Sequence, residues 1–142
     1  MIIEVIPDNI NDYGVFCSKN LKSEGFKLKR DWYIKQFELG WRIAILMEEK
    51  KQLGFIKYGP SEHAWRPIVA NDQFFIQCVM VQSKADRSKG LASQLISYVE
   101  KQAKENGMNA LCTLSSEGAW LASKALYEKM DLSKLTLEVG FN

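Results

Sequence analysis

Residues 74–92 read FFIQCVMVQSKADRSKGLA, and this is the most informative stretch of the sequence. Its first part, 74–81, is a strand-length apolar run, and its end opens an amphipathic run from Leu91 to Asn106 that is typical of a helix. A basic turn containing Arg87 and Gly90 joins the two. The first backbone N–H groups of a helix lack intrahelical partners, and the helix dipole adds partial positive charge. A strand, a glycine-containing turn and a helix start therefore indicate an anion-binding cradle.

The residues of this turn fit two interpretations, a ligand-binding turn and an ordinary strand-to-helix turn. Gly90 lets the backbone approach a ligand closely, and the small side chain of Ala92 leaves room for it. Taken alone, however, the pattern R-x-x-G-x-A also fits a plain strand-to-helix turn with solvated Lys84, Arg87 and Lys89. The Walker pattern G-x-x-x-x-G-K-[ST] and the dinucleotide pattern G-x-G-x-x-G are both absent from the sequence.

Length and composition favour one globular domain over residues 1–142. Hydrophobic residues make up 46% and charged residues 25%, which is ordinary for a folded domain. A net charge of +2 is too small to indicate a nucleic-acid partner. The apolar runs are strand-sized, so we expect no membrane-spanning segment.

The cysteines and the single histidine predict no metal site. Cys17, Cys78 and Cys112 are scattered, odd in number and without metal-ligand spacing. We therefore expect a reduced cytoplasmic protein with free thiols. The N-terminus has no basic stretch before its first apolar residues, so we do not expect a signal peptide.

The apolar periodicity predicts a mixed sheet with helices on its faces. Helices are expected from Asp8 or Asn9 to about Asn20, around Trp32 to Phe37 with a stop at Gly40, and at 91–106 and 119–130, with a loop around Gly25. Strands are expected at 2–6, 41–47, 53–58, 74–81, 110–114 and 135–139. The second and third of these strands are close in sequence and should form an antiparallel hairpin.

Tyr127 has two interpretations. It lies near the end of the expected helix 119–130, beside an apolar stripe that includes Leu126 and Met130. Its hydroxyl either sits at the surface, as is common for a helix tyrosine, or is placed to donate a proton in catalysis.

Together, the order of these elements resembles the GNAT superfamily of acyl-CoA-dependent N-acetyltransferases. The resemblance rests on the strand 74–81, the R-x-x-G-x-A turn and the A-L-Y-E-K-M end of the helix at 119–130. The stretch 64–67, Ala-Trp-Arg-Pro, is also similar to a bacterial GNAT subgroup of unassigned substrate. The resemblance implies a mostly antiparallel mixed sheet with helices on both faces and a splay between two central strands.

The resemblance also implies acetyl-CoA as co-substrate and direct attack by an amine, without a covalent enzyme intermediate. Tyr127 matches the family's usual general acid, which protonates the leaving thiolate. The pantetheine arm would pair with backbone groups of the strand, and the pyrophosphate would sit on the turn. The implied cofactor-binding residues are Val79, Met80, Val81, Arg87, Ser88, Lys89, Gly90, Leu91 and Ala92.

The acceptor side of the expected site is less defined. Glu62 and His63 precede the strand 74–81, near where the family often places acceptor-binding groups, and they are candidates for the general base, although an exposed loop position is the plainer interpretation. Trp32 and Tyr33 are the better pocket candidates among the aromatic residues; Trp41, Tyr58 and Trp65 fit a core better. Cys78 is expected to be an inert strand cysteine rather than a nucleophile.

The chain departs from the family pattern in three places. The approach from Val81 to Arg87 is longer than usual, Asp131-Leu132 stands where Gly-Phe is common, and the sequence after Asp131 has room for one strand rather than two. A shortened strand pair would leave a sheet edge open, which suggests a homodimer.

These observations lead to an expected N-acetyltransferase acting on a primary amine of a small molecule or a protein. The alternative is a non-catalytic CoA-binding or protein-interaction module on the same fold. The sequence itself does not name the acceptor.

Overall fold

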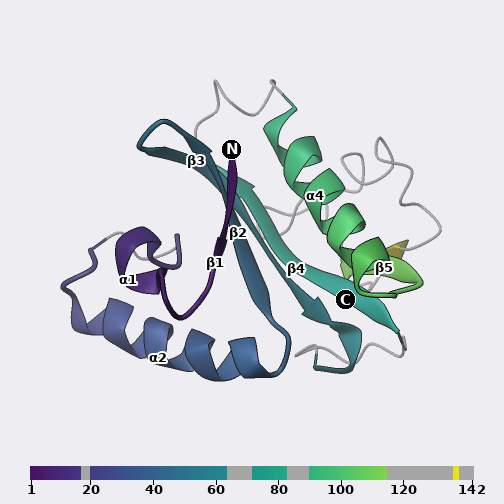
Figure 1. The fold of residues 1–142 in the computed structure, drawn as a ribbon, viewed down its shortest axis with the longest axis horizontal. Coiled ribbons are helices and arrows are strands. Elements are labelled where there is room, and N and C mark those ends of the chain that lie inside the picture. The colour runs from purple at the N-terminus through teal and green to yellow at the C-terminus, as the bar shows by residue number, and fades with distance from the viewer. Residues whose placement is uncertain (17–19, 64–71, 83–89, 115–135, 138–142) are drawn as a thin grey trace, which may run out of the picture.

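A computed structural model describes residues 1–16, 20–63, 72–82, 90–114 and 136–137 (Figure 1). In these residues the strands form one six-stranded sheet in the order β1-β2-β3-β4-β5-β6. The strands are β1 (Ile2–Val5), β2 (Arg42–Glu48), β3 (Lys51–Pro60), β4 (Gln73–Val81), β5 (Ala110–Leu114) and β6 (Thr136–Leu137). The helices are α1 (Ile10–Tyr13), α2 (Glu24–Glu38) and α4 (Leu91–Glu105), and a short 3₁₀ turn, η1 (Ser61–His63), follows β3.

The sheet is mostly antiparallel, as expected from the sequence. β1 to β4 pair antiparallel in chain order, whereas β4 with β5 and β5 with β6 pair parallel. The hairpin expected from the two neighbouring apolar runs is β2–β3. A parallel pair needs a crossover between its strands, and α4 provides it between β4 and β5.

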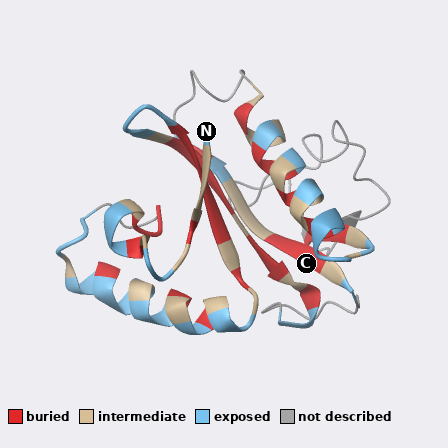
Figure 2. Ribbon diagram, viewed as in Figure 1, coloured by how far each residue is buried: buried red, intermediate tan, exposed pale blue. Residues whose placement is uncertain are grey.

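Helices cover both faces of the sheet, which confirms the expected fold class (Figures 1 and 2). On one face α4 buries Leu91, Leu95, Ile96, Val99 and Ala103 against β2 to β5. These positions follow the four-residue spacing of one helix face. On the other face, α1 and α2 pack Ile10, Phe26 and Tyr33 against a second apolar cluster that includes Val5, Ile45 and Phe55.

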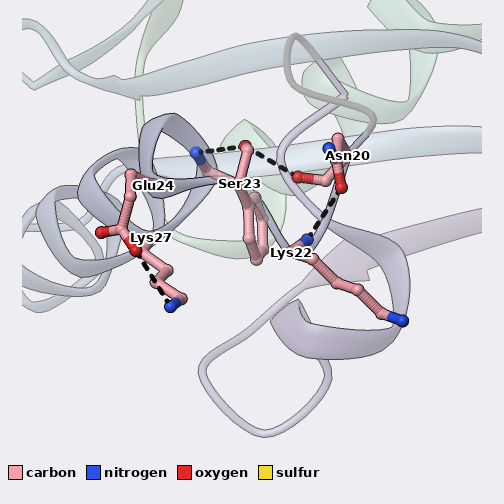
Figure 3. A network of polar contacts seen from close by, with 6 residues as sticks. Asn20, Lys22, Ser23, Glu24 and Lys27 are labelled. Carbon is pink, nitrogen blue, oxygen red and sulfur yellow. Dashed lines mark hydrogen bonds and ion pairs between the residues drawn. The ribbon is translucent and has the colours of Figure 1, made fainter.

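Helix α2 begins at a well-made cap (Figure 3). Ser23 Oγ accepts a hydrogen bond from the Phe26 N–H at 3.0 Å and donates one to the Asn20 carbonyl at 2.9 Å. This side-chain cap satisfies one of the N–H groups that a helix start leaves unpaired. The expected loop at Gly25 is therefore wrong, because the cap at Ser23 starts the helix early enough to include that glycine. The expected stop is confirmed, since Gly40 follows the helix with a φ of 103°.

The first helix is much shorter than its sequence pattern indicates. A helix to about Asn20 was expected, but α1 ends at Tyr13 and Gly14 follows with a φ of 73° and an extended ψ of −162°. After this break Val15 and Phe16 are buried against the sheet, and Phe16 stacks on Phe55 with ring centroids 4.6 Å apart. Burial of this aromatic pair replaces the continuation of the helix.

Other expected elements match closely or lie outside the described residues. The helix at 91–106 is α4, and the strands at 74–81 and 110–114 are β4 and β5. The expected helix at 119–130, which carries Tyr127, lies outside the described residues. Of the strand expected at 135–139, two residues are described, as β6.

Candidate functional site: an open strand edge beside an apolar pocket

The parallel pairing of β4 with β5 covers only the first half of β4. The register runs from Gln73↔Ala110 to Ile76↔Thr113, while β4 continues to Val81. At the last paired position the Thr113 Oγ1 donates a buried hydrogen bond of 2.9 Å to the Ile76 carbonyl. Beyond Ile76, the β5-facing edge of β4 has no register partner among the described residues. The described register thus ends at the part of β4 where the sequence resemblance implied a strand splay.

The hydrogen-bond pattern shows which backbone groups face this open edge. The Gln82 N–H donates to the Leu53 carbonyl at 2.8 Å, which makes these two residues a hydrogen-bonded pair of the β3–β4 ladder. Backbone groups of an antiparallel strand alternate in direction, so Met80 and Cys78 also face β3. The N–H and C=O of Val79 and Val81 therefore point to the opposite, open edge.

A bulge in β4 lies next to the open edge. Lys57 pairs with Cys78 and Tyr58 pairs with Ile76, so Gln77 is an extra residue in the ladder. A bulge re-aims side chains that would otherwise alternate between the two faces of the sheet. Here Gln77 and Cys78 both line a pocket on the α1–α2 face.

The turn expected to bind an anion is described only from Gly90 onward; Arg87, Ser88 and Lys89 lie outside the described residues. Gly90 has a φ of 75°, and α4 begins there without a hydrogen bond from a capping side chain. A Cβ built on Gly90 meets nothing within 4 Å among the described atoms. Among the described residues, no side chain caps the first turn of α4, with Leu91 and Ala92, as an anion cradle requires.

The pocket beside the bulge has a volume of about 280 Å³. It lies between α2 and the sheet, so that α2 supplies one wall and β2, β3 and β4 supply the other. It is lined by Val15, Lys29, Trp32, Tyr33, Ile43, Phe55, Lys57, Gln77 and Cys78. Trp32 and Tyr33, the two aromatic residues expected at an acceptor pocket, both line it. Trp41 and Tyr58 are about 1% exposed and belong to the core, and Trp65 lies outside the described residues.

Two lysines give the pocket a positive charge. Lys57 reaches across from β3, where its Nζ lies 4.8 Å from the ring centroid of Trp32 and 3.0 Å from Gln36 Oε1. Lys29 lies one turn before Trp32 on α2 and is exposed. The lining residues that the structure describes include no Asp or Glu.

Tyr33 has a structural role in the wall of the pocket and does not act as a proton donor in catalysis. Its hydroxyl donates to the Val5 carbonyl at 2.8 Å and accepts from the Ile43 N–H at 2.9 Å. Burial raises the pKa of Tyr33 well above the ordinary value of a phenol. The hydroxyl therefore stays protonated and holds β1, β2 and α2 together.

The two base candidates lie away from this pocket. Glu62 and His63 are exposed in η1, and neither belongs to the pocket lining. Glu62 Oε1 accepts a hydrogen bond from the Asp72 N–H at 3.1 Å, which joins the end of η1 to the segment that leads into β4. Their assignment as a catalytic base stays a prediction.

The two described cysteines, Cys78 and Cys112, differ in environment. Cys112 is buried, and this burial raises the pKa of its thiol to about 11, so the thiol stays protonated and inert. Cys78 is half-buried and lines the pocket. No group of three potential metal ligands occurs in the described part of the chain. Among the described helices, none is long and apolar enough to cross a membrane.

Comparison with known proteins identifies the family of this chain. The model of the acetyltransferase (GNAT) family matches residues 7–132. The chain belongs to the GNAT acetyltransferase family. The class expected from the sequence, acyl-CoA-dependent N-acyltransferases, is the class of this family, and the resemblance drawn from β4, the turn and the helix end is confirmed.

One curated relative of this GNAT chain is an uncharacterized N-acetyltransferase, YoaP, of Bacillus subtilis (strain 168). The two sequences are 28% identical over 132 residues, which is 90% of this chain and 51% of the relative. The GNAT chain thus spans about half the length of the curated relative that it matches.

Solved structures share the fold across the whole chain. The aminoglycoside 6'-N-acetyltransferase AAC(6')-IG from Acinetobacter haemolyticus superposes with a TM-score of 0.70 at 13% identity, covering 100% of this chain and 97% of the other. AAC(6')-Iy in complex with the bisubstrate analog CoA-S-monomethyl-acetylneamine gives a TM-score of 0.66 at 13% identity, with coverage of 100% and 95%. At these identities the likeness shows the GNAT fold alone.

Proposed function

We propose that this chain is an N-acetyltransferase that transfers an acetyl group from acetyl-CoA to a primary amine. The observation that carries the proposal is the open edge of β4, where the backbone groups of Val79 and Val81 have no β5 partner in the described register. Membership of the GNAT family supports it. A CoA-containing complex of a protein with the same fold adds support for the co-substrate.

The backbone groups of β4 and of the start of α4 suit two parts of CoA, the pantetheine arm and the pyrophosphate. An extended pantetheine arm carries amide groups, and the Val79 and Val81 backbone can pair with them as a strand edge pairs with a peptide. Among the described residues, the first turn of α4 begins without a side-chain cap, and its N–H groups can hold a pyrophosphate. The backbone groups of Met80 face β3 and not the open edge, so that Met80, which is 47% exposed, would contact CoA through its side chain.

Acetyl-CoA supplies an acetyl group activated as a thioester. The amine lone pair forms the new C–N bond, the C–S bond breaks, and the proton that nitrogen loses ends on the CoA sulfur. Tyr127 is the proposed donor of that proton to the sulfur, and an amide N–H at the open edge of β4 would polarise the thioester carbonyl. Glu62 and His63 remain the proposed base candidates, and from their exposed position they would act through water.

The pocket beside the bulge is the proposed acceptor site. It lies on the α1–α2 face next to β4, so that Gln77 and Cys78 separate it by a single strand from the proposed pantetheine edge. An amine bound there approaches the acetyl group from the side opposite α4.

The proposal is tested by ligand binding and by turnover. Saturating acetyl-CoA should raise the melting temperature, because a ligand at 100 times its Kd stabilises the folded state by about 2.7 kcal/mol. Release of free thiol should then depend on added amine. Absence of any thermal shift would refute the CoA site. A thermal shift without amine-dependent thiol release from a broad amine panel would instead favour the non-catalytic CoA-binding module.

A further inference from the structure

Gln77 has an unpaired polar atom in the wall of the pocket beside the bulge. Its Oε1 is buried and has no hydrogen-bond partner in the described part of the chain. A buried carbonyl oxygen without a partner costs free energy, because it has given up its hydrogen bonds to water. Such atoms are rare in folded proteins, and each needs an explanation such as a role at a functional site.

The β4 bulge explains why this amide lies at the pocket. Gln77 is the extra residue between Ile76 and Cys78 in the β3–β4 ladder, and a bulge re-aims the side chain that it carries. Gln77 lines the pocket together with Cys78. The last torsion of a glutamine side chain is broad, so the amide can turn its oxygen toward a ligand. An N–H of a ligand in this pocket would therefore provide the hydrogen bond that the fold does not.

Most of the pocket wall around Gln77 is apolar. The aliphatic and aromatic lining residues are Val15, Trp32, Tyr33, Ile43 and Phe55. The polar lining residues are Lys29, Lys57, Gln77 and Cys78. Tyr33 offers its ring to a ligand, because its hydroxyl is bonded to the Val5 carbonyl and the Ile43 N–H. Lys57 Nζ donates to Gln36 Oε1 at 3.0 Å. A hydrocarbon body is thus favoured in the pocket over a body whose polar groups would lose water against this wall.

We infer that the acceptor is a primary amine on an aryl or alkyl body, and that Gln77 positions it by accepting one of its N–H groups through Oε1. The inference rests on the proposed function and names the substrate class of the same pocket. An amide oxygen accepts this hydrogen bond without taking the proton, so Gln77 orients the amine and is not a base. Aminoglycosides, named for a protein of the same fold, are disfavoured because their many polar groups would lose water against the apolar wall.

The test replaces Gln77 with methionine, which keeps an unbranched side chain of similar length without the amide. Phenethylamine is the probe, titrated by calorimetry with saturating CoA present so that no turnover occurs. In Gln77→Met its Kd should rise about tenfold, as expected for the loss of one hydrogen bond. The melting temperature without ligand should equal or exceed that of the wild type, because the substitution removes an unpaired buried oxygen. Gln77→Glu keeps an acceptor oxygen and should bind phenethylamine at least as tightly as the wild type.

Gln52 on β3 provides the matched control. Its Nε2 donates to the Tyr13 carbonyl at 2.8 Å, and it is not among the residues that line this pocket. Gln52→Met should therefore lower the melting temperature, because it breaks a hydrogen bond that the fold makes, and should leave the Kd for phenethylamine unchanged. The two glutamines thus respond in opposite ways to the same chemical change if Gln77 serves the ligand rather than the fold.

Because binding is measured without turnover, this inference and the proposed function can fail separately. If acetyl-CoA binds but no amine is acetylated, the proposed activity fails, while the phenethylamine titrations still decide the acceptor class. The wild-type protein alone supplies a further measurement, since phenethylamine should bind more tightly than the aminoglycoside neamine. Tighter binding of neamine, an unchanged Kd in Gln77→Met, or a Gln77→Met variant less stable than the wild type would overturn the inference.

Discussion

Replacing Tyr127 with phenylalanine is expected to lower kcat by about a hundredfold or more, since a positioned general acid contributes roughly 10²–10⁴-fold to a rate. The leaving group of the proposed reaction is a thiolate, and the variant has no hydroxyl to protonate it. Binding of acetyl-CoA should change little, because the proposed cofactor contacts come from β4 and the start of α4. Steady-state thiol release, together with a calorimetric titration of acetyl-CoA, measures both quantities.

Tyr98→Phe is the matched control for this variant. Tyr98 lies half-buried on α4, hydrogen-bonded to Tyr58 and away from the acceptor pocket, so losing its hydroxyl should affect stability more than turnover. Full activity of Tyr127→Phe across the pH range would remove Tyr127 from the mechanism. A loss of acetyl-CoA binding in that variant would instead make it a binding residue.

Gly54→Ala is expected to destabilise the domain by about 3 kcal/mol, at the upper end of the cost of overpacking. A Cβ at Gly54 would lie 2.6 Å from the backbone oxygen of Met80 and 3.4 Å from the Cα of Val81. These are backbone atoms of the neighbouring strand, so β3 and β4 would have to move apart. Because β4 is the strand proposed to bind acetyl-CoA, the melting temperature and the acetyl-CoA affinity should fall together.

Gly25→Ala provides the control with the same chemical change. Among the described atoms, an added Cβ there would meet Ser23 Oγ at 4.0 Å, near the start of α2. Alanine in a helix is favoured over glycine by about 0.5–1 kcal/mol, so this variant should be slightly more stable than the wild type. Thermal or denaturant unfolding measures both variants. Equal stability of Gly54→Ala and the wild type would show that β3 and β4 are not packed as closely as described.

Much of the fold could be predicted from the sequence because its signals are local. The apolar run of β4 and the four-residue spacing in α4 gave both elements within a residue or two of their observed ends. The aromatic pair Trp32 and Tyr33 was assigned to a pocket, and both residues line it. Binding of a pyrophosphate at the turn between the two elements was predicted from the resemblance to a family, because no spacing rule alone indicates it, and it stays a prediction.

Features that depend on register were not predicted. The bulge at Gln77 is invisible in an apolar run, since it arises from how β4 pairs with β3. From the sequence, Lys57 resembles an ordinary solvated lysine of a strand. In the structure it pairs with Cys78 of β4, and its ammonium group lies over the ring of Trp32 on α2. The signal that was available for Gln77 is its polar amide within a run of apolar neighbours.

The early part of the chain shows how tertiary contacts override local preference. The sequence after Asp8 favours a long helix, but the helix stops at Gly14 and the chain turns to bury Phe16 on Phe55. This places Val15 in the wall of the pocket that is the proposed acceptor site. Local helix propensity does not indicate such a competing tertiary contact.

Hydrogen exchange at single amides, with and without saturating acetyl-CoA, shows whether acetyl-CoA pairs with the open edge of β4. The Val79 and Val81 N–H groups face the open edge of β4, whereas the Met80 N–H already faces β3. Acetyl-CoA should slow exchange at Val79 and Val81 by about tenfold or more relative to Met80, because a tenfold change corresponds to 1.4 kcal/mol, near the value of one hydrogen bond. If acetyl-CoA leaves exchange at Val79 and Val81 unchanged, or slows it no more than at Met80, acetyl-CoA does not bind along this edge of β4.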